Sequence, residues 1–178
     1  MIVIHANDPT TRFLSVLYQQ RKDVVCLVNE TNSSSDVQRA IRADDAIVML
    51  GHGNEYGLFS KPSKNGKYER FMITDRHVQF LRDKTCIGIW CYANQFAERY
   101  GLHGLFSGMI ISELQEAIEL GIPAAKDEIY KERERFDLRL KNCIEAYSFE
   151  EIPARMKSLD DTQSELTKFN YSNLYYYE

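Results

Sequence analysis

Two reactive side chains stand out because each directly follows a short apolar run. His52 follows the run at 46–50 and lies between two glycines, and Cys91 follows the run at 86–90. A thiol and a nearby imidazole are the groups that a cysteine nucleophile requires. In open α/β sheets, sites form at the carboxyl ends of the strands. We therefore expect His52 and Cys91 to share one site if their strands are neighbours.

Such a site also needs hydrogen-bond donors for an oxyanion. Gly53 has no side chain to obstruct a substrate, so its backbone N–H is one expected donor, and the N–H of Cys91 is the other. Cys91 also precedes a predicted helix. The amino end of that helix could lower the pKa of the thiol.

The elements that would position these residues alternate along the chain. Asp8 followed by Pro9 is typical of a helix start. Strands are expected at 1–5, 23–28, 46–50, 86–90 and within 105–111, where 109–111 is the most apolar part. Further helices are expected at 36–42, from 75, and at 94–100, 113–120, 123–147 and 149–159. This alternation predicts right-handed crossovers, and hence an α/β fold: a three-layer α/β/α sandwich with a mainly parallel sheet.

The chain is expected to form one domain over 1–178, since its length suits a single core. Residues 54–74 contain glycines, a proline and several lysines between small apolar pieces, which predicts a hairpin or lid beside the site. From 123 onward we expect a helical C-terminal extension. The apolar stripe of its long helix would include Phe136, Leu140 and Cys143.

Composition narrows the function classes. With 26 acidic and 22 basic residues and a net charge of -4, the chain shows no overall footprint for binding nucleic acid. We find no apolar run long enough for a membrane span and no signal-peptide pattern. The four cysteines form no CxxC pair and no zinc-ligand spacing. We expect Cys26, Cys86 and Cys143 to be buried free thiols, and we expect a reducing cytoplasmic location, no metal and no cofactor.

The apolar strand ending in His52-Gly53, followed by a second apolar strand ending in Cys91, resembles the caspase-like (clan CD) cysteine peptidases. That family includes caspases, metacaspases, gingipains and CHAT domains. The likeness covers roughly 46–111, and it implies a caspase-like fold and a protein or peptide substrate. It also implies a dyad in which Cys91 attacks the carbonyl to form a thioester and His52 protonates the leaving amine. One departure is the bulky Trp90, where the family often has a small or acidic residue.

The resemblance also suggests a specificity pocket. In the family, the segment after the cysteine's helix shapes this pocket, often with an acid that binds a basic P1 residue. Glu113, preceded by Ser112, is the corresponding candidate here. Alternatively, Glu113 only stabilises the first turn of its own helix.

A second interpretation is a catalytically silent caspase-like or flavodoxin-like module that acts in protein–protein interaction or signalling. The tyrosine-rich end could then contact a partner protein or a second copy of the chain, since aromatic residues favour interfaces; it could equally pack on its own domain. A nucleotide-binding domain is disfavoured because 51–53 lacks the third glycine of the fingerprint. The remaining histidines, His5, His77 and His103, are expected to be structural.

Overall fold

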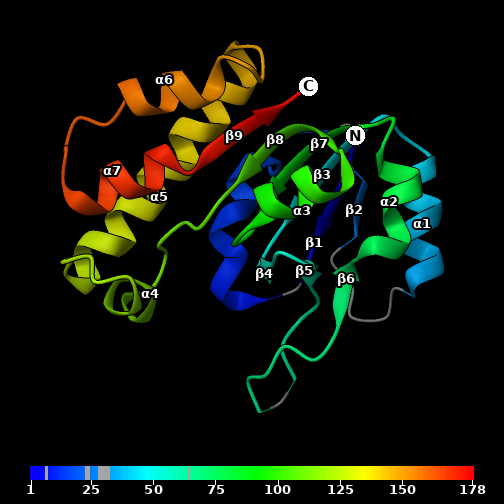
Figure 1. Ribbon diagram of the computed structural model, residues 1–178, viewed down its shortest axis with the longest axis horizontal. Helices are drawn as coiled ribbons and strands as arrows, with labels where there is room; N and C mark the ends of the chain where they lie inside the picture. Colours follow the sequence, from blue (N-terminus) through cyan, green and yellow to red (C-terminus); the bar gives the residue numbers. More distant parts are fainter. Residues whose placement is uncertain (7, 23–24, 28–32, 64) are drawn as a thin grey trace.

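The computed structural model describes residues 1–6, 8–22, 25–27, 33–63 and 65–178. Within these ranges a six-stranded sheet has the order β2-β1-β3-β7-β8-β9 (Figure 1). The first five strands in this order run parallel, and β9 is antiparallel to β8. Their bounds are β1 Ile2–His5, β2 Val25–Leu27, β3 Ala46–Leu50, β7 Thr85–Ile89, β8 His103–Ser107 and β9 Leu174–Tyr177. The predicted α/β fold with a mainly parallel sheet is confirmed.

The central strands are buried on both faces, which explains why they appear as continuous apolar runs rather than alternating ones. In β3, Ile47 and Met49 belong to one hydrophobic cluster and Val48 and Leu50 belong to another. Each cluster fills the space between one face of the sheet and its covering helices. Helices therefore cover both faces.

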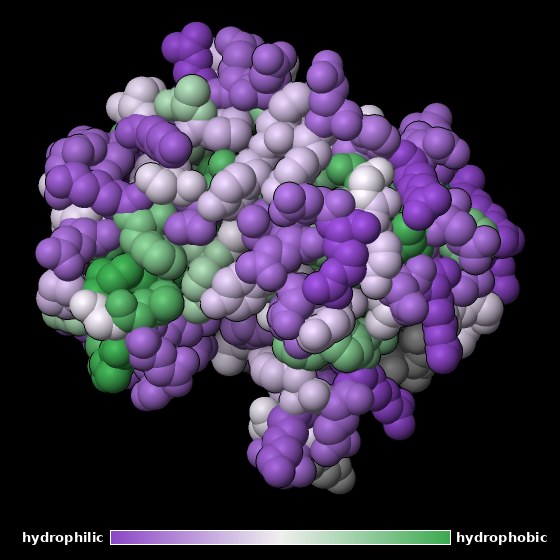
Figure 2. Space-filling model, in the orientation of Figure 1, coloured by the Kyte–Doolittle hydropathy of each residue, from purple (hydrophilic) through white to green (hydrophobic). Residues whose placement is uncertain are grey.

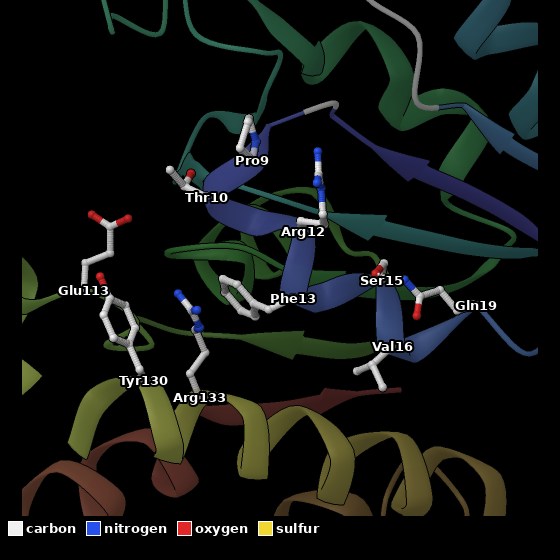
Figure 3. A pocket seen from close by; sticks show the side chains of 10 residues that line it. All are labelled: Pro9, Thr10, Arg12, Phe13, Ser15, Val16, Gln19, Glu113, Tyr130 and Arg133. Atoms are coloured by element: carbon white, nitrogen blue, oxygen red, sulfur yellow. Dashed lines mark hydrogen bonds between the residues drawn. The ribbon is translucent and has the colours of Figure 1, made fainter. Parts of the chain in front are cut away.

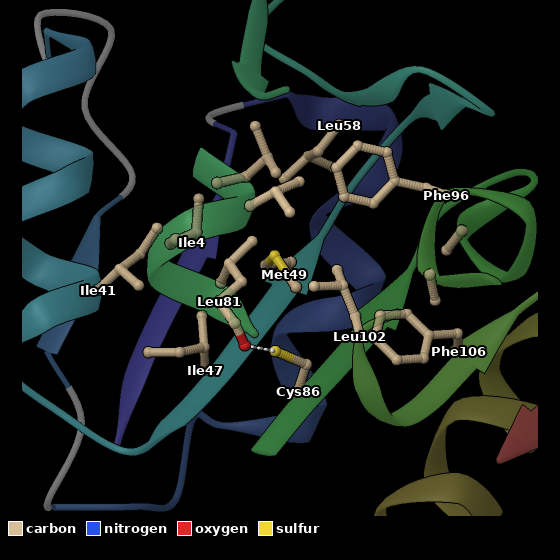
Figure 4. Packing of buried hydrophobic residues seen from close by; sticks show 14 of the residues in the cluster. Ile4, Ile41, Ile47, Met49, Leu58, Leu81, Cys86, Phe96, Leu102 and Phe106 are labelled. Atoms are coloured by element: carbon tan, nitrogen blue, oxygen red, sulfur yellow. Dashed lines mark hydrogen bonds between the residues drawn. The ribbon is translucent and has the colours of Figure 1, made fainter. Parts of the chain in front are cut away.

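The first face is covered by α1 (Ser34–Arg42), α2 (Asp75–Leu81) and α3 (Ala93–Tyr100). Side chains from these helices pack on β1, β3 and β7, as Figure 4 shows for Ile41, Leu81 and Phe96. The helix starts are encoded locally, since Ser33 and Thr74 form capping boxes. Gly101 ends α3 in the left-handed conformation, at φ 63°.

The second face is covered by a 3-10 helix, η1 (Pro9–Leu17), and by α5 (Lys126–Ala146), α6 (Ile152–Ser158) and α7 (Glu165–Ser172). Phe136 and Leu140 of α5 are buried here, as the predicted stripe requires. The side chain of Asp8 caps η1 by accepting from the Thr10 N–H. The short α4 (Leu114–Glu119) contributes Ala117 to a third, smaller cluster.

The segment after His52 forms a second, antiparallel sheet of β4 (Gly53–Asn54), β5 (Gly57–Phe59) and β6 (Phe71–Ile73). Because β4 begins directly after the turn that ends β3, this small sheet lies at the carboxyl ends of the main strands. The expected hairpin at 54–74 is thus present beside the candidate site.

Two sequence expectations need correction. The strand expected within 105–111 is present, but it lies earlier than its most apolar part, at β8, so 109–111 is not a strand. The apolar run is held instead by α7, where the Asn170 side chain accepts from the Ile111 N–H at 2.8 Å and donates to the Ile111 carbonyl at 2.9 Å. The C-terminal segment is helical from Lys126 rather than 123, and it is no mere extension because β9 returns to the main sheet.

Among the described helices, none combines the length and apolar character needed to cross a membrane.

Candidate active site

His52 and Cys91 follow neighbouring parallel strands. β3 and β7 are paired with Leu50 opposite Ile89, and the Gly51 N–H donates to the Ile89 carbonyl at 3.1 Å. Both reactive residues line one cavity of about 40 Å³, together with Ser112. No hydrogen bond between His52 and Cys91 is found in the described part of the chain. The structure therefore brings the two groups to one cavity.

The electrostatic environment of Cys91 differs from the sequence expectation. Burial raises the pKa of its thiol to about 12, and the nearby Glu116 carboxylate acts in the same direction. The expectation that the following helix lowers this pKa is wrong in direction. The reason is that desolvation of the sulfur dominates, even though α3 begins at Ala93, one residue nearer to the cysteine than expected. The free protein consequently holds Cys91 as a neutral thiol.

The turn that carries Cys91 is strained at the next residue. Tyr92 lies in the left-handed region, at φ 67° and ψ 25°, which is uncommon for a residue other than glycine. Its N–H donates to the Gly108 carbonyl at 3.3 Å, and the buried Ser107 hydroxyl donates to the Trp90 carbonyl at 2.8 Å. Such strain persists where the surrounding structure enforces it, often at functional sites. Strand β8 thus holds the turn in place.

Trp90, the departure from the family pattern, points away from Cys91 into the cluster on the other face of the sheet. Its indole N–H donates to the Asn54 carbonyl at 3.1 Å. A Cβ at Gly53 would lie 2.2 Å from Trp90 Cδ1 and 2.5 Å from the Gly57 carbonyl oxygen. Glycine is therefore required at 53 by packing against Trp90, independently of any substrate.

The backbone N–H of Gly53 remains a candidate oxyanion donor. The carbonyl of His52 accepts from the Phe59 N–H at 2.8 Å, so it points toward β5. In a trans peptide the following N–H points the opposite way, and the described chain contains no cis peptide bond. The Gly53 N–H therefore points away from β5 and is not used in pairing with it.

The two residues predicted to form the specificity pocket line different cavities. Ser112 lines the cavity of Cys91, whereas Glu113 lines an adjacent cavity of about 570 Å³ (Figure 3). Phe13 and Arg133 line both cavities, so the two are neighbours. The N–H groups of Ser112 and Glu113 donate to the Glu116 carboxylate at 2.7 and 3.0 Å. Glu116 therefore binds the two amides that directly precede α4, and Glu113 lines the larger cavity.

Three residues around His52 were not assigned to the site from the sequence. Thr10 Oγ1 lies 2.8 Å from His52 Nε2, and the Thr10 hydroxyl donates to Asp8 at 2.8 Å. The Tyr68 hydroxyl donates to the other Asp8 oxygen at 2.7 Å, and the Tyr68 ring lies 5.3 Å from the His52 ring. Burial alone raises the pKa of Asp8, but hydrogen bonds from Tyr68 and Thr10 outweigh it and hold that pKa below its usual value.

A buried carboxyl group on α5 was also missed. Asp137 is 3% exposed and lines the Cys91 cavity, and its Oδ2 atom has no hydrogen-bond partner in the described structure. Burial raises its pKa to about 8, although Arg133 opposes the shift. The sequence offered one indication that Asp137 is buried: it directly follows Phe136, on the apolar stripe of a predicted helix.

The other histidines have structural contacts. His5 is buried between Tyr18 and Thr11, at 3.0 and 3.2 Å, and burial lowers its pKa to about 4. His77 accepts from the Thr74 N–H at the start of α2, and His103 is the exposed first residue of β8. The predictions that His5 and His77 are structural agree with these contacts.

Of the remaining cysteines, Cys86 and Cys143 are buried free thiols, as expected. The side chain of Cys26 lies outside the described residues. The described residues contain no cluster of three or more His, Cys, Asp or Glu side chains arranged to hold a metal ion.

Comparison with protein-family models and with curated proteins finds no match to this chain.

Proposed function

We propose that the chain is a caspase-like cysteine endopeptidase that cleaves a peptide bond through His52 and Cys91. The observation that carries this proposal is that both side chains leave the carboxyl ends of adjacent parallel strands and line one cavity. The chain order, an apolar strand ending in His-Gly and then one ending in Cys, supports the caspase-like assignment. The left-handed turn at Tyr92 adds support, since it fixes the position of the nucleophile.

The chemistry follows from the protonation states. Cys91 Sγ attacks the substrate carbonyl as its proton passes to the imidazole of His52. The carbonyl oxygen becomes an oxyanion that accepts from the N–H groups of Gly53 and Cys91. The His52 imidazolium then protonates the leaving amine, the C–N bond breaks and a thioester remains. Water hydrolyses the thioester with His52 as general base, which returns the thiol and releases a carboxylate.

Because the thiol is neutral in the free protein, transfer of its proton accompanies the attack rather than preceding it. This order suits a buried sulfur, since a thiolate without a substrate would be poorly solvated. It also allows His52 to begin the cycle in its neutral form.

We assign the P1 contact to Glu113, which lines the cavity of about 570 Å³ beside that of the dyad (Figure 3). A Lys or Arg side chain that enters this cavity can pair with Glu113. A hydrogen bond to a charged group contributes about 1.5 to 3 kcal/mol. Removal of the charge should therefore lower kcat/KM for basic P1 residues by roughly 10- to 100-fold.

Peptide libraries varied at P1 test this function and its specificity together. Wild-type protein should cleave after Arg or Lys, Cys91→Ala should be inactive, and Glu113→Gln should lose the preference. Glu119→Gln is a matched control, because Glu119 is exposed at the end of the same helix. A preference that is unchanged in Glu113→Gln removes Glu113 from the pocket. If no library member is cleaved in a Cys91-dependent manner, the peptidase proposal is refuted.

A catalytically silent interaction module is the second candidate. It is favoured by an apolar patch over α4, where Leu114, Ile118 and Leu120 are 38%, 62% and 40% exposed (Figure 2). On the outer strand β9, Tyr175 and Tyr176 are also exposed. In that case Ile118→Glu would abolish binding of a partner or of a second copy of the chain, whereas Cys91→Ala would leave binding unchanged.

A further inference from the structure

We propose that Asp8 and Thr10 position His52 by fixing its neutral ring with the proton on Nε2, which leaves Nδ1 to exchange protons with Cys91 and the substrate. This inference rests on the proposed function for its catalytic consequence. The hydrogen-bond arrangement itself is a separate claim and can be tested separately.

The direction of each hydrogen bond follows from a count of protons. The Asp8 carboxylate can only accept, and it lies 2.8 Å from the Thr10 hydroxyl and 2.9 Å from the Thr10 N–H. The Thr10 hydroxyl has one hydrogen, which is donated to Asp8. Its contact with His52 Nε2 at 2.8 Å can then form only if Nε2 carries the proton. The relay therefore runs from His52 to Thr10 to Asp8.

Asp8 is suited to this role because it is 5% exposed and both of its oxygens are engaged. Tyr68 donates to the second oxygen at 2.7 Å from the segment between β5 and β6. The Tyr68 ring also stacks on Phe59, with centroids 5.1 Å apart and an angle of 18° between the planes. Burial, reinforced by Asp8, raises the pKa of Tyr68, so its hydroxyl remains a donor. The carboxylate thus has a fixed position and a fixed charge.

The catalytic consequence is electrostatic and geometric. When Nδ1 takes the proton of Cys91, the ring becomes an imidazolium whose Nε2–H still bonds to Thr10. The oriented Thr10 hydroxyl and the Asp8 charge stabilise that cation, and no proton moves along the relay. Asp8 and Thr10 are positioning residues, because they act through His52 and do not contact the reacting atoms.

The matched variants are Thr10→Val, which removes the hydroxyl, and Thr10→Ser, which keeps it. Thr10 is exposed, so both variants should fold, which circular dichroism checks. We expect Thr10→Val to lower kcat about 10- to 100-fold with little change in KM, and Thr10→Ser to stay within about threefold of wild type. Thr85→Val is the control, because Thr85 is exposed at the opposite, amino end of β7.

A second readout needs no substrate. Long-range proton–nitrogen NMR of the neutral His52 ring should show Nε2 protonated, with an Nε2–H signal that broadens by solvent exchange in Thr10→Val and persists in Thr10→Ser. A wild-type ring protonated on Nδ1 overturns the relay, as does a Thr10→Val enzyme with unchanged kcat. A protein that cleaves no peptide but gives the expected ring signals refutes the proposed function and supports the relay.

Discussion

The neutral state of Cys91 leads to a prediction about its reactivity in the free protein. Burial raises the pKa of this thiol from 9.0 to about 12, so at any pH below 9 its thiolate is roughly 1000-fold scarcer than that of an ordinary cysteine. A thiolate of higher pKa is intrinsically more nucleophilic, by about 20-fold over this difference. The net expectation is an alkylation rate about 50-fold lower than that of the same cysteine in the unfolded chain.

Iodoacetamide labelling between pH 6 and 9, followed by peptide mass spectrometry, measures this rate for each cysteine. The same peptide labelled in concentrated urea supplies the reference. Cys86 is an internal comparison, since it is fully buried and its pKa is likewise raised to about 12 by burial. Glu116→Gln should modestly accelerate the labelling of Cys91, because it removes the second cause of the raised pKa, while its amide oxygen can still accept from the N–H groups of Ser112 and Glu113.

The opposite result has a clear meaning. If Cys91 in the folded protein reacts faster at pH 6 than in urea, and His52→Ala abolishes that excess, then a thiolate–imidazolium pair exists at rest. The reasoning from burial would then be refuted, and the earlier expectation of a lowered pKa would be restored.

Three further predictions concern the framework of the site, each measured by urea unfolding. Asp137 has a folded-state pKa of about 8, far above its unfolded value, so between about pH 4 and 8 the folded protein binds a proton that the unfolded chain does not. The free energy of unfolding of the wild type should therefore fall as the pH rises through this range, by up to about 1.4 kcal/mol per pH unit. Asp137→Asn should remove that slope; an unchanged slope contradicts the assignment. Gly53→Ala should lower the free energy of unfolding by about 1 to 3 kcal/mol, because the new Cβ collides with Trp90. An unchanged urea midpoint would show that the Trp90 ring can move aside. Asn170→Leu leaves the buried N–H and carbonyl of Ile111 unpaired, so it should lower the free energy of unfolding by about 2 to 5 kcal/mol. A decrease below about 1 kcal/mol would mean that other groups replace the Asn170 amide.

The features that could be predicted from the sequence are those encoded locally. The runs at β3 and β7 are short, apolar and followed by reactive residues, and their parallel pairing places His52 and Cys91 at one cavity. Capping residues such as Asp8 mark helix starts for the same reason, since their partners lie within three positions. Local periodicity was sufficient for these elements.

The features that were missed depend on contacts between distant segments. Asn170 pairs with Ile111, 59 residues away, and this side-chain amide holds an apolar run that otherwise resembles a strand. Tyr68 reaches Asp8 across 60 residues. The pKa of the half-buried Cys91 is raised by desolvation of its thiol and by the Glu116 carboxylate, whereas the sequence displays only the helix that follows it. Tertiary context therefore determined the electrostatics of the site.

The most direct measurement of the central claim is covalent capture by a peptidyl acyloxymethyl ketone with Arg at P1, followed by intact mass and peptide mapping. A dyad predicts one adduct, on Cys91, at a rate that falls at least 100-fold in His52→Ala, with Cys86 and Cys143 unmodified. If no adduct forms on Cys91, or if its rate is the same with and without the imidazole, then His52 and Cys91 are not a catalytic pair.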